Sequence, residues 1–152
     1  MKYNYYDTEI IKDLVIQGLD KLVEYSENEK QYMDLVEKQF SFYGSKINWE
    51  KTINHVGASY NDETLISEAS AFVNKLRETV LVREEKVIYI GDGLTSLVYT
   101  FDLSNLPKML PILLSIPQHH YFLPVDCTWC ICIAIENSFD FGISGHDDKV
   151  NL

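Results

Sequence analysis

The feature that most constrains the fold of this chain is a change in the spacing of its apolar residues between residues 81 and 86. Before it, apolar side chains recur every three or four residues over 7–26, 28–44 and 62–81, which is the spacing of amphipathic helices. After it, short β-branched and aromatic runs alternate with Gly, Pro and Asn, which is typical of strands and turns. This order predicts an α+β fold, in which N-terminal helices pack on one face of a C-terminal antiparallel sheet of about four to five strands.

The strands are expected in five runs of the C-terminal part, at 86–90, 96–101, 120–123, 128–136 and 139–144. The Asp92-Gly93 pair predicts a hairpin between the first two runs, and Asn137-Ser138 predicts a turn between the last two. The run 128–135 is apolar on both faces and is expected to be a central strand. A short helix is expected over 102–114, with Pro107 in its first turn.

Further expectations concern the N-terminal part and the extent of the domain. Asp7 is expected to cap the first helix at its N-terminus. The segment 47–60 has mixed signals, and a short helix near Trp49 and Ile53 is expected before Gly57. A length of 152 residues fits one domain over 1–152, with a helical half at about 7–81, a mainly β half at about 86–144 and a loose tail at 145–152.

The charge of the chain restricts its partners. Thirteen Lys and Arg face 23 Asp and Glu, so the net charge is −10. Phosphate contacts dominate nucleic-acid binding and anionic lipids attract basic segments, so neither a nucleic-acid nor a membrane partner is expected. A basic protein partner fits this charge, although negative charge also serves solubility alone.

The compartment is predicted from the start of the chain and the cysteines. The first residues lack the apolar region of a signal peptide, no apolar run is long enough to span a bilayer, and the three cysteines are an odd count. These features together predict a cytoplasmic protein in a reducing environment.

Candidate catalytic groups are few. Cys127 and Cys130 have C-x-x-C spacing, but there is no second such pair for zinc, and alternation places Cys130 and Cys132 on one strand face and Cys127 on the other. His119 and His120, with Asp126, could form part of a metal or hydrolytic site, although alternation points the two imidazoles to opposite faces. There is no phosphate-binding loop or nucleophile elbow. We therefore expect no enzyme, no metal and no cofactor.

Four segments of the C-terminal part resemble the immunity proteins of bacterial polymorphic toxin and contact-dependent growth-inhibition systems. They are 87–92, 117–122, 126–130 and 139–142, within a similarity that covers about 86–144. The resemblance implies a cytosolic, non-enzymatic inhibitor that binds the toxic C-terminal domain of a partner, often a nuclease. It implies no catalytic residues, and 117–120 and 141–142 are expected to maintain the fold.

Both the charge and the resemblance lead to one hypothesis, an acidic protein that covers the basic cleft of a toxin. The residues expected to contact the partner are carboxylates and an aromatic in the β half: Asp92, Asp126, Glu136, Asp140 and Tyr121. Two alternatives stay open. One is a small metal-dependent or hydrolytic enzyme that uses His119, His120 and Asp126, and the other is an adaptor without a toxin partner.

Overall fold

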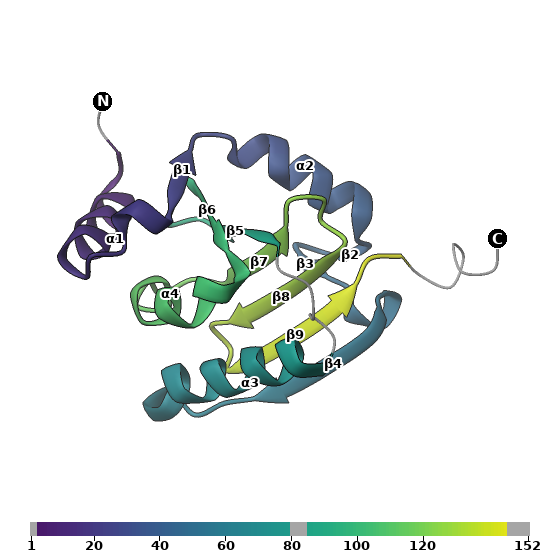
Figure 1. Ribbon diagram of the computed structural model, residues 1–152. Coiled ribbons are helices and arrows are strands. Elements are labelled where there is room, and N and C mark those ends of the chain that lie inside the picture. The colour runs from purple at the N-terminus through teal and green to yellow at the C-terminus, as the bar shows by residue number, and fades with distance from the viewer. Residues whose placement is uncertain (1–2, 80–84, 146–152) are drawn as a thin grey trace.

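The computed structural model describes residues 3–79 and 85–145, and it combines four α-helices with a large antiparallel sheet (Figure 1). The helices are α1 (Tyr5–Ile16), α2 (Glu29–Gln39), α3 (Leu65–Thr79) and α4 (Leu106–Leu113), with short 3₁₀ helices at Asp20–Leu22, Trp49–Lys51, Asp62–Thr64 and Leu103–Asn105. The strands are β1 (Glu24–Ser26), β2 (Phe42–Tyr43), β3 (Lys46–Ile47), β4 (Ile53–Ser59), β5 (Lys86–Gly91), β6 (Val98–Asp102), β7 (His120–Pro124), β8 (Trp129–Ala134) and β9 (Ser138–Ile143).

Seven strands of the described chain form one sheet in the order β1-β6-β5-β7-β8-β9-β4, and every neighbouring pair is antiparallel. The five strands expected in the C-terminal part are confirmed as β5 to β9. β8 lies inside the sheet, and all six of its residues are buried. Its apolar character on both faces therefore predicted its position correctly.

The sheet is larger than the four to five strands expected, because β1 and β4 come from the half that was expected to be helical. The first helix ends at Ile16 and not near residue 26. Gly18, at φ +72, supports two bonds that end the helix: its own N–H donates to the Val15 carbonyl, and the Leu19 N–H donates to the Leu14 carbonyl. This is a Schellman arrangement, in which a left-handed residue closes the helix.

β4 replaces the short helix expected near Trp49 and Ile53; only the 3₁₀ turn Trp49–Lys51 is helical there. β4 is mostly exposed on both faces, so its sequence lacks the alternation that marks a half-buried strand. The second helix also ends earlier than expected, at Gln39, and Gly44 at φ +66 forms the turn between β2 and β3.

The helices cover both faces of the sheet, which corrects the expectation of a single covered face. α1, α3 and α4 share one apolar cluster with Tyr89, Phe122 and Ile131, whereas α2 packs on the other face (Figure 1). The residues on that second face are Ile88, Ile90, Leu123 and Cys130, all fully buried. The inner strands are apolar on both sides, so each side requires a covering layer.

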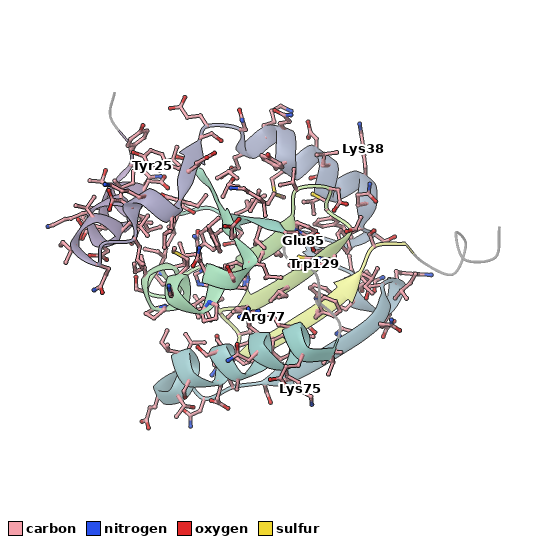
Figure 2. The ribbon with its side chains drawn as sticks, in the orientation of Figure 1. Tyr25, Lys38, Lys75, Arg77, Glu85 and Trp129 are labelled. Carbon is pink, nitrogen blue, oxygen red and sulfur yellow. The ribbon has the colours of Figure 1, made fainter. Side chains whose placement is uncertain are left out.

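The strand β8 is also tied to the segment that precedes β5. The indole Nε1 of Trp129 donates to Oε1 of Glu85 at 2.7 Å, and Figure 2 shows the two side chains next to each other. The expected end of the third helix near 81 and the tail after residue 145 lie outside the described residues. Within 3–79 and 85–145, no helix has the length and apolar character that crossing a membrane requires.

Candidate partner-binding surface

A hollow of about 140 Å³ opens on the α2 face of the sheet, at the end where β8 leaves the sheet and β7 and β9 enter it. The β2–β3 hairpin and the 3₁₀ turn before β4 border it. Its lining combines charged and aromatic side chains: Lys46, Trp49, His119, Tyr121, Glu136 and Asp140. A concave site with aromatic walls and a few charges is suited to recognition of another molecule.

His119 is held between two carboxylates at the rim of this hollow. Its Nδ1 accepts a bond from the Ile135 N–H at 3.0 Å, so its proton lies on Nε2. Nε2 faces Oε1 of Glu136 at 3.6 Å and Oδ2 of Asp92 at 3.8 Å. Asp92 is fixed by a second contact, because its Oδ1 accepts from the His119 N–H at 3.0 Å.

Lys46 on β3 reaches across to Glu136 on the other side of the hollow, with 2.6 Å between Nζ and Oε1. The hydrogen bond from Lys46 lowers the pKa of Glu136, and the same bond raises the pKa of Lys46. Both side chains remain about half exposed, at 54% and 52%. Water screens such a pair, so a cation from a partner can compete with Lys46 for this carboxylate.

Asp140 on β9 is paired with His55 on β4, with 2.7 Å between Oδ1 and Nε2. The imidazole stacks on the Trp49 indole, with ring centroids 5.8 Å apart and planes at 15°. Burial raises the pKa of Asp140 and outweighs the opposite effect of His55. Gly57 lies directly opposite Asp140 in the sheet, and the absence of a side chain there leaves space for this pair.

Four of the five residues expected to contact a partner meet at this end of the sheet. Tyr121, Glu136 and Asp140 line the hollow, and Asp92 is at its rim. Asp126 does not join them: it lies in the turn between β7 and β8, at the opposite end of β8, where Oδ1 accepts from the Thr128 hydroxyl at 2.8 Å.

The sequence did not indicate the contributions of Lys46, Trp49 and His55 to this surface. All three belong to the half that was expected to be helical, and their positions depend on β3 and β4. No local motif marks them, because β4 is placed beside β9 by a pairing between residues about 80 positions apart, such as Gly57 and Asp140.

His120 points to the opposite face from His119, as alternation predicted, and belongs to a buried network. Its Nδ1 is 2.7 Å from the Tyr89 hydroxyl, which accepts from Nε2 of Gln118 at 2.9 Å. Gln118 also donates to Thr95 and accepts from the Leu94 N–H. Burial, with a smaller effect of His119, lowers the pKa of His120 to about 4, so this imidazole is neutral at pH 7.

The set proposed for an alternative enzyme is therefore not assembled. His119 and His120 lie on opposite faces, and Asp126 is at the far end of β8. Across 3–79 and 85–145, no group of three His, Cys, Asp or Glu side chains is arranged to hold a metal ion.

The cysteines are buried and protonated. Burial raises the pKa of all three thiols, to about 11 for Cys127. Cys127 and Cys130 lie in the same apolar cluster on the α2 face, which corrects the expectation of opposite faces. The reason is local: Cys127 has φ 58 and lies in the turn before β8, where strand alternation does not apply.

Comparison with known proteins identifies no relative: no family model matches the chain, and no curated protein or solved structure is significantly similar to it.

Proposed function

We propose that this protein binds a basic protein partner through the hollow between the β2–β3 hairpin and β7, β8 and β9, and that it carries out no bond-making chemistry. In line with the resemblance in its C-terminal part, the partner is the toxic C-terminal domain of a bacterial toxin, which this chain neutralises. The observation that carries the proposal is the convergence of Asp92, Glu136 and Asp140 beside Trp49 and Tyr121.

The chemistry of this surface favours recognition. Aromatic side chains supply contact area at a low entropy cost, and carboxylates bind Lys or Arg side chains through charge-assisted bonds. A net charge of −10 also attracts a basic domain from a distance, and such steering raises association rates by factors of about 10–1,000 at low salt. Rapid association suits an inhibitor that must reach a lethal enzyme before it acts.

Features that would support catalysis instead are weak at this surface. The nearest thiol, Cys132, is buried, and burial together with Asp140 raises its pKa. His55 lies beside Asp140 and His119 lies beside Glu136. A histidine next to a carboxylate is found in structural ion pairs as well as in catalytic sites, so these contacts do not favour catalysis.

Co-expression tests the proposal. The C-terminal domain encoded by the neighbouring reading frame is induced in cells with and without this chain, and growth is recorded. We expect the toxin domain alone to stop growth and this chain to restore it, with the two proteins co-purifying at equal stoichiometry. A toxin domain that still stops growth in the presence of this chain, or the turnover of a substrate by the purified chain alone, would contradict the proposal.

A further inference from the structure

The strand β4 forms one edge of the sheet and is bonded on one side, by β9. Among the described residues no strand pairs with its other side. Six of its seven residues are exposed. The opposite edge strand, β1, has three residues and begins with the charged Glu24, and shortness and charge are the usual protections of a sheet edge.

The pairing with β9 shows which backbone groups of β4 point outward. The Tyr60 N–H donates to the Asn137 carbonyl at 3.0 Å, in register with the pairs Ala58–Phe139 and Val56–Phe141. In an antiparallel ladder, bonded pairs alternate with pairs whose N–H and C=O groups turn away. Gly57 and Ser59 therefore direct their backbone donors and acceptors away from β9, toward the free side.

The regular part of this free side, Val56 to Ser59, lacks the charges, proline and bulges that normally block strand addition. The seven residues of β4 contain no Lys, Arg, Asp, Glu or Pro. The register shift between Ile53 and Val56, at Asn54 with φ 57, disturbs the first part of the strand, whereas Val56 to Ser59 pair regularly. Gly57, without a side chain, allows another backbone to approach closely.

We infer that β4 accepts an extended, Lys- or Arg-bearing segment of the protein partner as an additional strand. The inference rests on the proposed function, because it assigns this edge to the same partner. Asp140 on β9 lines the hollow, and its ion-pair partner His55 lies on β4. A segment bonded to β4 would therefore continue the partner-binding surface.

Charge distinguishes the partner from a second copy of this chain. Before β4 the exposed Glu50 and Lys51 offset each other, whereas the exposed Asp62 and Glu63 after it leave the surroundings of the strand negative. The two carboxylates after β4 favour a basic segment. Two copies that joined through β4 would bring together two chains of net charge −10, and this repulsion disfavours a self-paired edge.

Amide hydrogen exchange tests the inference with a defined probe, an acetylated and amidated octapeptide in which lysine alternates with valine. In the free chain, we expect the amides of Gly57 and Ser59 to exchange rapidly and those of Ala58 and Tyr60 to be protected. Saturation with the peptide should slow exchange at Gly57 and Ser59 by about tenfold or more. The glutamate–valine peptide, and a lysine–valine peptide N-methylated at alternate residues, should not slow it.

Variants at one position separate backbone pairing from side-chain contact. Ser59→Pro removes an outward donor and leaves the ladder to β9 intact, so it should abolish peptide binding without unfolding the chain. Ser59→Val keeps the donor and should bind as the wild type does. Three results would overturn the inference. They are slow exchange of the Gly57 and Ser59 amides in the free monomer, a dimer that Ser59→Pro dissociates, and equal binding of the lysine–valine and glutamate–valine peptides.

The inference and the proposed function can fail separately. If the toxin domain binds while the Gly57 and Ser59 amides still exchange rapidly in the complex, the edge assignment is wrong and the proposed function stands. If the lysine–valine peptide protects both amides but co-expression restores no growth, the edge accepts a basic strand and the toxin partner is wrong.

Discussion

Replacing Asp7 with alanine is expected to lower the free energy of unfolding by about 3–5 kcal/mol, since hydrogen bonds to a charged group contribute about 1.5–3 kcal/mol each. Asp7 was expected to cap α1, but Asn4 does so, with its side chain accepting from the Asp7 N–H at 2.8 Å. The Asp7 carboxyl group is fully buried and joins α1 to the segment that leads into β6. It accepts from the Ser96 N–H at 2.8 Å and the Tyr99 hydroxyl at 2.6 Å.

Urea denaturation of three further variants makes this expectation specific. Asp13→Ala changes the same residue type in the same helix and should stay within about 0.5 kcal/mol of the wild type, as is usual for substitutions that break no buried contact. Tyr99→Phe removes one of the bonds and should cost about 1–2 kcal/mol. Asp7→Asn keeps the shape of the side chain, so its loss of unfolding free energy should lie between those of Tyr99→Phe and Asp7→Ala. A loss below 1 kcal/mol for Asp7→Ala would show that this carboxyl group does not anchor α1.

Acidification from pH 6.5 to pH 4 is expected to destabilise the protein by about 3 kcal/mol through His120 alone. Burial lowers the pKa of His120 to about 4, whereas an imidazole in the unfolded chain titrates near 6.5. Between these values the unfolded chain binds a proton that the native chain does not. The contribution of neutral His120 to the free energy of unfolding is complete above about pH 6.5. As the pH falls below this value, the contribution decreases by up to about 1.4 kcal/mol per pH unit.

The measurement is the free energy of unfolding at several pH values for the wild type and for His120→Gln, which retains a donor and an acceptor for the Tyr89 network. Other titrating groups affect both proteins, so the difference between the two curves isolates His120. We expect the two curves to converge as the pH falls from 6.5 to 4. Parallel curves over this range would mean that the His120 pKa is not lowered in the native state.

The parts of the fold that the sequence predicted are those specified by nearby residues. β5 to β9 follow from strand-like runs bounded by turn residues such as Asp92-Gly93 and Asn137-Ser138, and α2 and α3 follow from apolar stripes. The end of α1 was missed although Gly18 marks it, because the apolar residues after Gly18 continue the same spacing through a 3₁₀ turn and β1. β4 was missed because its exposed sequence carries no alternation, and its place depends on β9.

The candidate site was predictable to the extent that it follows from turn positions. Glu136 and Asp140 flank the turn between β8 and β9, and Asp92 follows β5, which is antiparallel to β7, so these residues reach one end of the sheet. Asp126 precedes β8 and Glu136 follows it, and a strand of this length separates its ends by roughly 20 Å. Alternating strand directions alone could therefore have excluded Asp126. Lys46 and His55 could not have been found in this way, because their strands were not predicted.

The affinity of the toxin domain for two matched double variants tests the central claim most directly. Asp92→Asn/Glu136→Gln removes two charges at the hollow, and Asp102→Asn/Asp126→Asn removes two exposed charges at the opposite end of the sheet. Calorimetry should show that the first variant binds about 100-fold more weakly, because each lost carboxylate contact contributes about 1.5 kcal/mol, while the second binds within about threefold of the wild type. Equal weakening by both variants, or by neither, would contradict binding at this hollow.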